Sequence, residues 1–191
     1  MNRLKTAADW DKYNRAEQGR KLSPFELDQF RQRVPLKPGA RVVDLGCGNG
    51  HWTRELATLG CDVVGYDWAP GTVKRAQVKR SLARQPHFEV WDIDAGPLPM
   101  GLLHKPVDLV TCRFALGCFD LHGFGELVGE ILGATGRLYV LTDVRRTGID
   151  LPPSFQAVPA RALRRLEARF SSVESWQLGL REARLMSGCA L

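Results

Sequence analysis

One stretch of nine residues decides the fold: VVDLGCGNG, which runs from Val42 to Gly50. It is an apolar run that meets an acidic residue and then a loop with glycine at every second position. Glycine is needed where the backbone adopts positive φ, or where a ligand must approach the main chain without a Cβ in the way. A strand that delivers such a loop to the edge of an α/β sheet forms a site for a nucleoside-containing cofactor. The stretch therefore predicts such a site.

The spacing of the loop narrows the choice of cofactor. The dinucleotide-binding fingerprint requires Gly-x-Gly-x-x-Gly, and its last glycine opens the helix that holds the pyrophosphate. Here that position is His51, because the third glycine comes one residue early, at Gly50. Asp44 stands directly before the loop, where a carboxylate repels a pyrophosphate and attracts a cation. S-adenosylmethionine carries a sulfonium and an ammonium and no phosphate, so the loop favours it over a nicotinamide cofactor, which is the alternative.

The nine residues resemble the first motif of the class I S-adenosylmethionine-dependent methyltransferases. Three later segments resemble further motifs of that family, in the same order and at similar spacing: Val63–Asp67, Phe88–Ile93 and Val107–Leu116. The resemblance implies a Rossmann-like, doubly wound α/β sheet of about seven strands, mostly parallel with an antiparallel last strand. The alternation of strand-like and helix-like segments independently indicates a mainly parallel sheet with helices on both faces.

The resemblance also assigns cofactor roles to residues near the strand ends. Asp67 would bind both ribose hydroxyls, and it lies about 20 residues beyond the first glycine, the spacing expected of a ribose-binding acid. Asp92 would accept from the adenine amine. The expected cofactor-binding residues are Asp44, Gly46, Cys47, Gly48, Asn49, Gly50, Asp67, Trp68, Asp92, Ile93, Cys112 and Arg113.

Structural alternatives exist for three of these assignments and for one in the N-terminal region. Trp68 would cover one face of adenine, with Ile93 on the ring edge, or it is a surface aromatic residue. Asp92 is alternatively a helix or turn cap. Tyr13 would face the methionine carboxylate or the acceptor, or it packs its helix on the sheet. Cys112, next to an expected strand, is alternatively a small buried hydrophobic residue.

Two helices are expected before the glycine loop, over about Ala7–Glu17 and from Ser23 onward. Residues 23–26 read Ser-Pro-Phe-Glu, a capping box with proline at the first helical position. The resemblance implies that residues 1–38 form a cap over the cofactor and substrate site, within one compact domain whose methyltransferase part covers residues 39–191. The expected substrate residues are Trp10 and Tyr13 of this cap, together with Phe114 and Phe119 at the mouth of the site.

Methyl transfer from a sulfonium requires chiefly that the nucleophile is held close and in line, which contributes about 7–11 kcal/mol. A general base is needed only when the acceptor is protonated at the working pH. Similar proteins often carry Arg-Phe-Ala-Leu-His-His after the fourth strand, but this chain has Gly117-Cys118 in place of the histidines. No catalytic base is therefore assigned. Tyr13, Asp120 and His122 are candidates, although a lone histidine such as His122 is more often an ordinary loop residue.

Composition and charge bound the possible functions. The chain has 191 residues, of which 44% are hydrophobic and 25% charged, as expected for one soluble domain. It lacks a signal-peptide core and any apolar run near the roughly 20 residues of a membrane helix, which predicts a cytoplasmic protein. Its five scattered cysteines form no Cys-x-x-Cys pair, and its four histidines form no i, i+4 pair, so no metal site is expected.

The net charge of +6 is compatible with a solvated helical face or with a nucleic-acid footprint. The basic segments lack the interleaved aromatic residues of a single-strand platform. The Asn-Pro-Pro-Tyr-like tetrad of amino-group nucleic-acid methylases is replaced by residues 112–115, Cys-Arg-Phe-Ala. The leading hypothesis is methyl transfer to a small molecule on an O, N, S or C atom, with S-adenosylhomocysteine as the product. The alternatives are RNA or protein methylation and a non-catalytic, cofactor-binding regulatory domain; the sequence specifies no oligomeric state.

Overall fold

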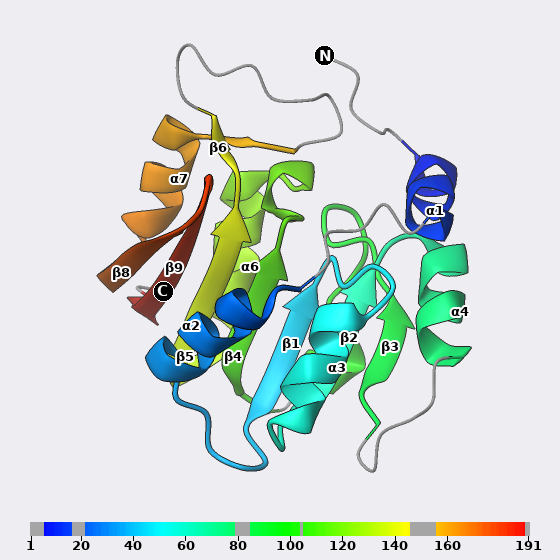
Figure 1. Cartoon of the computed structure of the whole chain (residues 1–191), viewed down its shortest axis with the longest axis horizontal. Helices are drawn as coiled ribbons and strands as arrows, with labels where there is room; N and C mark the ends of the chain where they lie inside the picture. Colours follow the sequence, from blue (N-terminus) through cyan, green and yellow to red (C-terminus); the bar gives the residue numbers. More distant parts are fainter. Residues whose placement is uncertain (1–5, 17–21, 79–84, 104, 146–155, 190–191) are drawn as a thin grey trace.

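The computed structural model describes residues 6–16, 22–78, 85–103, 105–145 and 156–189. These residues form a seven-stranded sheet in the order β3-β2-β1-β4-β5-β9-β8 (Figure 1). The strands of this sheet are β1 (Arg41–Leu45), β2 (Asp62–Asp67), β3 (His87–Val90), β4 (Val107–Arg113), β5 (Leu132–Thr142), β8 (Phe170–Leu178) and β9 (Arg181–Cys189). Strands β1 to β5 pair in parallel, and β9 is antiparallel to both of its neighbours. The predicted fold class is confirmed.

Helices cover both faces of the sheet. In Figure 1, α2 and α3 lie in front of the strands, α6 lies behind them, and α1 and α4 lie side by side beyond β3. The helices of the described residues are α1 (Ala7–Arg15), α2 (Pro24–Arg33), α3 (His51–Thr58), α4 (Pro70–Val78), the short α5 (Met100–Leu103), the 3-10 turn η1 (Leu116–Cys118), α6 (Leu121–Ile131) and α7 (Ala160–Glu167). None of them is long and apolar enough to cross a membrane.

The alternation of β1 side chains builds two cores, one on each face. Val42 points to the face of α2 and α3, where Phe30 contacts Trp52 and Tyr139 edge-on at centroid distances of 4.7 and 4.9 Å. Val43 points to the opposite face and belongs to the larger core. Because successive strand residues point to opposite faces, two adjacent valines are sufficient to anchor both layers.

The larger core joins the sheet to α6 and α7. Phe124, Val128 and Ile131 recur at helical spacing on α6, and each is buried in this core. The spacing of four and then three residues places the three side chains on one face of the helix. The side chains of α6 therefore close the sheet face opposite α2 and α3.

The expected element boundaries differ from the observed ones mainly at β3 and β5. Strand β3 ends at Val90, because the chain then turns and the amide of Gly96 donates to the carbonyl of Asp92 at 2.7 Å. Strand β5 begins at Leu132, earlier than expected, through an irregular register against β4. A short parallel pair, β6 (Val144–Arg145) and β7 (Val158–Pro159), was not expected from the sequence.

Candidate cofactor and substrate site

A cavity of about 730 Å³ lies where the carboxyl ends of β1, β2 and β4 meet. This volume is within the range of about 300–1,000 Å³ that is typical of small-molecule sites. Ligands of open α/β sheets bind in the crevice at this edge. Its wall is lined by Trp10, Tyr13, Asn14, Asp44, Gly46, Cys47, Gly48, Asn49, His51, Trp52, Asp67, Trp68, Trp91, Asp92, Ile93, Asp94, Arg113, Phe114, Ala115, Cys118, Phe119 and Gln156.

The structure brings most of the expected site residues into this one wall. All four expected substrate residues line it, and so do all the expected cofactor residues except Gly50 and Cys112. Cys112 is fully buried in the core, and this burial raises the pKa of its thiol well above the ordinary value. Gly50 has φ +73°, and a Cβ there would lie 2.5 Å from the ring of Phe88. Neither residue lines the cavity, because Cys112 packs in the core and Gly50 against Phe88 of β3.

Gly46 lines the cavity and also makes room for a neighbouring loop. Its φ is +71°, and a Cβ at this position would lie 2.3 Å from the Cβ of Ala115, in the loop that follows β4. Only glycine fits such a combination of backbone angle and close approach. The first glycine of the loop therefore allows two strand-end loops to pack together, and the cavity wall forms where they meet.

Asp44 is a buried carboxylate in the cavity wall. Its Oδ2 accepts from the Thr53 hydroxyl at 2.7 Å, and its Oδ1 accepts from the Thr111 hydroxyl at 2.9 Å. Burial raises the pKa of Asp44 to about 6, while the two threonine hydrogen bonds act in the opposite direction. The carboxylate that is expected to face the cationic end of a ligand is therefore already held by a hydrogen bond to each of its oxygens.

Asp67 is held by the backbone at the end of β2. Its Oδ2 accepts from the Gly48 amide and its Oδ1 from the Ala69 amide, both at 3.0 Å. Burial raises the pKa of this carboxyl group. Each carboxylate oxygen retains acceptor capacity beyond one hydrogen bond. The side chain is thus fixed in the cavity wall by two backbone donors, and the ribose role stays a prediction.

Asp92 lies in the turn after β3. It lines the cavity, and its Oδ1 also accepts from the Asp94 amide at 3.2 Å, as in a turn cap. Trp68 and Ile93, expected around the adenine ring, are both partly buried and line the same wall. Together with Asp92 and Asp94, they extend the wall from the end of β2 to the turn after β3.

Arg113 is fixed by a buried ion pair. Its Nε donates to Oε1 of Glu26 at 2.5 Å and its Nη2 donates to Oε2 at 3.0 Å, with side chains that are 9% and 4% exposed. Such bidentate pairing gives geometric specificity as well as attraction. Glu26 belongs to α2, which otherwise packs on the sheet through Phe30. Among the described residues, the N-terminal wall of the cavity comes from α1, and α2 reaches the site through this pair.

Phe114 has an unusual backbone conformation next to Arg113. Its φ is +62°, and it is the one non-glycine residue with positive φ in the described part of the chain. The guanidinium groups of Arg113 and Arg181 lie 4.6 and 4.9 Å from the centroid of its ring. Its amide donates to the Leu141 carbonyl at 2.7 Å. Strained residues of this kind gather at functional sites, and this one lines the cavity.

Two of the three catalytic candidates lie outside the cavity wall. Asp120 caps α6, where it accepts from the Gly123 amide at 3.1 Å. His122 is exposed, and its Nδ1 lies 3.2 Å from Nη2 of Arg169. Asp120 is the N-cap of α6 and His122 lies in its first turn, so neither lines the cavity. Tyr13 is the candidate that lines the cavity.

Several wall residues were not anticipated from the sequence. Asn14 follows Trp10 by four positions on α1, so helical periodicity already places it on the same face. His51 directly follows the glycine loop, and the sequence pattern indicates only that it replaces the last glycine of the dinucleotide fingerprint. Gln156 comes from a distant segment and carries no local signal.

The Gly117-Cys118 pair, which stands in place of two histidines, also has a structural explanation. A Cβ at Gly117 would lie 2.0 Å from the carbonyl oxygen of Gln156 and 2.7 Å from its carbonyl carbon. Backbone of a second segment therefore occupies the space that a larger residue would need. Cys118 lines the cavity. This part of the wall is built differently from the histidine-bearing pattern.

Comparison with known proteins identifies the class. Residues 42–137 match the family described as a methyltransferase domain. The chain belongs to this family, which confirms the resemblance to class I S-adenosylmethionine-dependent methyltransferases and the prediction of S-adenosylmethionine as the cofactor.

Curated relatives include the ubiquinone biosynthesis O-methyltransferase of Xylella fastidiosa (strain 9a5c), which is 40% identical over 144 residues. That match covers 74% of this chain and 56% of the relative. The protein of the same name from Leptothrix cholodnii is 30% identical over 105 residues, which cover 54% of this chain and 43% of the relative. The chain thus spans about half the length of the curated relatives it matches.

Solved structures share the fold at lower identity. Magnesium protoporphyrin IX methyltransferase from Synechocystis PCC 6803, with bound SAH, has a TM-score of 0.62 and 17% identity, and the match covers 94% of this chain and 93% of that one. A TehB-like SAM-dependent methyltransferase from Corynebacterium glutamicum has a TM-score of 0.65 and 17% identity, with 96% and 100% covered. Both support the Rossmann-like architecture.

The positive φ of Phe114 leads to a stability prediction. The substitutions Phe114→Gly and Phe114→Ala both remove the ring, but only glycine adopts a left-handed backbone without steric cost. The glycine variant should therefore be more stable than the alanine variant, by about 1–2 kcal/mol. Urea denaturation of the two variants measures this difference. An alanine variant as stable as the glycine variant would contradict the strained conformation.

The raised pKa of Asp44 leads to a prediction about pH. Because its folded pKa is about 6 against an ordinary 3.8, folding favours the protonated form, and this contribution is lost as the pH rises from about 4 to above 6. Asp44→Asn keeps both threonine partners, since a hydroxyl donates or accepts. The stability of the native protein relative to this variant should fall by on the order of 2–3 kcal/mol between pH 4 and pH 7. A difference that stays constant over this range would argue against the raised pKa.

Proposed function

We propose that this chain binds S-adenosylmethionine in the 730 Å³ cavity and transfers its methyl group to a small molecule, with S-adenosylhomocysteine as the product. One observation carries the proposal. A single wall collects the strand-end acids Asp44, Asp67 and Asp92 together with aromatic side chains from α1 and from the loop after β4. The acids suit a cofactor with hydroxyls, an amine and positive charge, and the aromatic side chains suit an acceptor beside it.

The cofactor roles follow from the fixed side chains. Asp67 accepts from the ribose hydroxyls with the oxygens that Gly48 and Ala69 already orient. Trp68 covers the adenine ring, and Asp92 accepts from its amine. Asp44 supplies negative charge near the cationic amino-acid end. Since all three acids are held in place before a ligand arrives, little reorganisation opposes binding.

The acceptor region is mainly aromatic. Trp10 and Tyr13 meet edge-on at 5.5 Å on α1, and Phe119 stacks on Phe124 at 5.5 Å with an interplanar angle of 7°. Such walls favour a planar or largely apolar acceptor. The curated relatives are named as O-methyltransferases of ubiquinone biosynthesis, so we favour oxygen as the acceptor atom.

The chemistry that the cofactor supplies is an electrophilic methyl group whose bond to sulfur breaks as the acceptor bonds to it. The residues of the chain hold the acceptor in line and exclude water, which is the larger part of what such a transfer requires. An acceptor hydroxyl must also lose its proton. His51 lines the cavity and carries an imidazole able to receive it, and the Tyr13 hydroxyl of the same wall can hydrogen-bond the acceptor.

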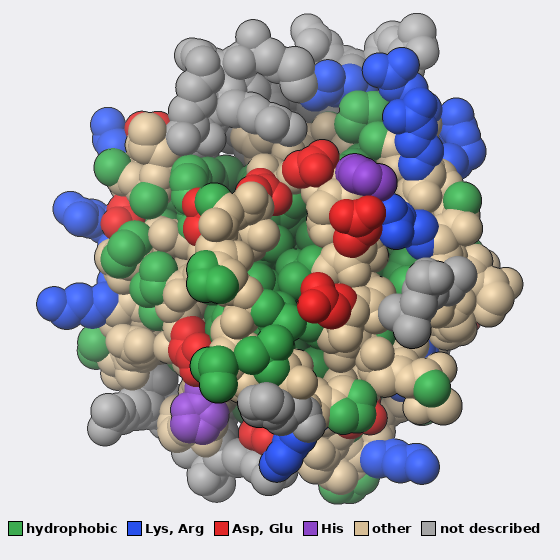
Figure 2. Space-filling view, turned by 180° about the vertical axis from the view of Figure 1, so that it is seen from behind, with side chains coloured by type: hydrophobic (Ala, Val, Ile, Leu, Met, Phe, Trp, Pro, Cys, Tyr) green, Lys and Arg blue, Asp and Glu red, His purple; other side chains and the backbone are tan. Residues whose placement is uncertain are grey.

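RNA methylation is the second candidate, and it rests on the charge of +6. The cavity itself has the opposite character. Its wall contains four aspartates, and Arg113, the arginine of the described wall, is paired with Glu26. In the face shown in Figure 2, most lysine and arginine side chains lie toward the margin, and the centre is mainly hydrophobic with several carboxylates. A polyanionic backbone is disfavoured beside such a wall.

We also place the protein in the cytoplasm. Cys47, in the cavity wall, and Cys112, in the core, are buried thiols that form no disulfide bond. Free thiols of this kind are typical of a reducing compartment.

Calorimetric titration tests the cofactor assignment. The native protein should bind S-adenosylmethionine and S-adenosylhomocysteine, and Asp67→Ala should weaken both by at least about tenfold, because two hydrogen bonds to a charged group are lost. Asp62→Asn, an exposed acid at the other end of the same strand, is the matched control and should leave binding unchanged. Binding of NAD in place of S-adenosylmethionine would overturn the proposal.

Transfer of a labelled methyl group tests the acceptor class. Labelled S-adenosylmethionine is incubated with the protein and with separated metabolite, RNA and protein fractions. The label should appear in the metabolite fraction as an O-methyl ether, which treatment with alkali does not cleave. Label in RNA would support the second candidate, and transfer to none of the fractions would support a regulatory, non-catalytic domain.

A further inference from the structure

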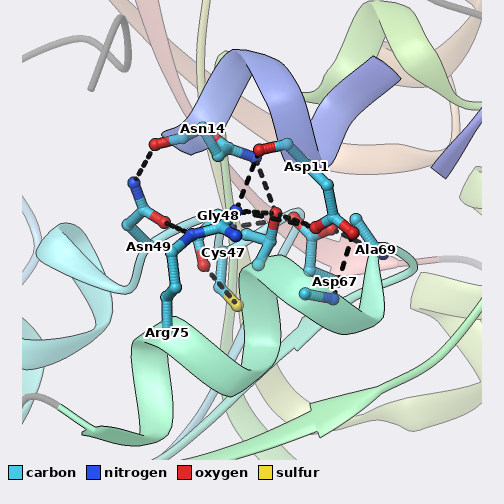
Figure 3. Close-up of polar contacts among 10 residues, drawn as sticks. Asp11, Asn14, Cys47, Gly48, Asn49, Asp67, Ala69 and Arg75 are labelled. Atoms are coloured by element: carbon cyan, nitrogen blue, oxygen red, sulfur yellow. Dashed lines mark hydrogen bonds and ion pairs between the residues drawn. The ribbon is translucent and has the colours of Figure 1, made fainter. Parts of the chain in front are cut away.

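Helix α1 docks on the rest of the protein mainly through polar contacts (Figure 3). The Asp11 carboxylate receives the Gly71 amide at 3.1 Å and the Thr72 hydroxyl at 2.8 Å. It also forms an ion pair with Arg75, whose Nη2 lies 3.6 Å from Oδ1. All three partners belong to the first turns of α4, so one side chain of α1 binds the start of a second helix.

This contact is a helix cap supplied from another helix. The first amides of a helix have no partner within it, and a carboxylate close to them satisfies a donor and interacts favourably with the helix dipole. Asp11 provides this for α4 from a position 60 residues earlier in the chain. α4 is thereby stabilised by α1, and α1 is held by α4.

Gly71 makes room for the Asp11 carboxylate. A Cβ at position 71 would lie 2.5 Å from Oδ2, 2.8 Å from Cγ and 2.9 Å from Oδ1 of Asp11. Glycine weakens a helix relative to alanine, and Gly71 does not have a positive φ that would demand it. The glycine in the first turn of α4 is therefore explained by the docking of Asp11.

The same contacts reach the glycine loop. Asn49 donates from Nδ2 to the Asn14 carbonyl at 2.7 Å, and the Nδ2 of Asn14 donates to the Thr72 hydroxyl at 3.3 Å. Arg75 bridges the two sides, because its Nη2 donates to the Asp11 carbonyl at 3.1 Å and its Nε lies 3.5 Å from Oδ1 of Asn49. α1, α4 and the loop over the cavity are thus connected by one polar network.

Apolar packing contributes little to this docking. α1 has nine residues, and Asn14 is its one buried residue. A helix of this length is marginal in water without tertiary contacts. Trp10 and Tyr13 line the cavity. Loss of the contact between Asp11 and α4 would therefore remove these two side chains from the wall and would break the hydrogen bond of Asn49 to the Asn14 carbonyl.

We infer that Asp11 is a positioning residue for the cavity: by capping α4 it holds Trp10 and Tyr13 in the wall and Asn49 in the glycine loop. This inference rests on the proposed function, since it takes S-adenosylmethionine as the ligand of the cavity. Asp11 itself is not part of the wall. It acts by setting the fraction of molecules in which α1 is docked. The apparent dissociation constant for S-adenosylmethionine is inversely proportional to that fraction.

Two substitutions break the contact from opposite sides. Asp11→Asn removes the charge that faces the helix terminus and Arg75, and Gly71→Ala displaces the carboxylate with a methyl group. Each should weaken S-adenosylmethionine binding in calorimetry by about tenfold, as expected when one charge-assisted contact is lost. The double variant should bind no more weakly than the weaker single variant, because the two changes remove the same interaction.

Thermal stability separates positioning from a purely structural role. Gly71→Ala gains the helix propensity of alanine and loses the Asp11 cap, two effects of similar size and opposite sign, so its melting temperature should stay close to that of the native protein while cofactor binding weakens. Gly101→Ala is the matched control, because a Cβ there meets nothing within 4 Å, and Asp28→Asn on exposed α2 surface controls for loss of charge. Neither control should change cofactor affinity.

The outcomes distinguish this inference from the proposed function. A native protein that does not bind S-adenosylmethionine would overturn the proposed function, and the inference with it. A native protein that binds, with Asp11→Asn and Gly71→Ala variants that bind equally well, would overturn the inference alone. A Gly71→Ala variant whose affinity falls only in step with a lower melting temperature would show that the contact serves folding and would also overturn it.

Discussion

The buried carboxylate of Asp44 is the interaction on which the site depends. It lies at the end of β1 and accepts from Thr53 of α3 and Thr111 of β4, so it joins β1 to a helix and to the neighbouring strand. A buried charge is unfavourable unless it is hydrogen-bonded. Here both oxygens are bonded, and the remaining unfavourable part appears as the pKa of about 6. The same arrangement places a carboxylate in the cavity wall, where a cationic ligand would offset that cost.

Charge is distributed differently inside the cavity and over the whole chain. The protein carries a net charge of +6, yet Asp44, Asp67 and Asp92 face one cavity and the charge of Arg113 is compensated there by Glu26. Coulomb interactions are stronger in a partly desolvated wall than at the exposed surface. The local sign therefore matters more for ligand choice than the overall sign, and it favours a cationic cofactor.

The sequence predicted the fold and the acids because their signals are local. A strand that ends in Asp67 can be identified from its own neighbours, and parallel strands bring such ends to one edge. Gln156 lines the cavity through tertiary contacts that no neighbouring residue in the sequence indicates. Asn14 is signalled only by its helical spacing from Trp10. The sequence could not show that His122 lies outside the cavity wall, because the direction of a first-turn side chain depends on how α6 lies on the sheet.

Several glycines of this chain make room for other segments of the protein. The pattern suggests close approach to a ligand, but Gly46 makes room for Ala115, Gly71 for Asp11 and Gly117 for the Gln156 backbone. In each case the missing Cβ lets another segment of the chain come close, and that segment then lines or supports the cavity. The glycines therefore act on the ligand through assembly of the wall. It follows that this chain departs from the histidine-bearing pattern at Gly117-Cys118 for a structural reason, because the Gln156 backbone lies where a larger residue at position 117 would need space.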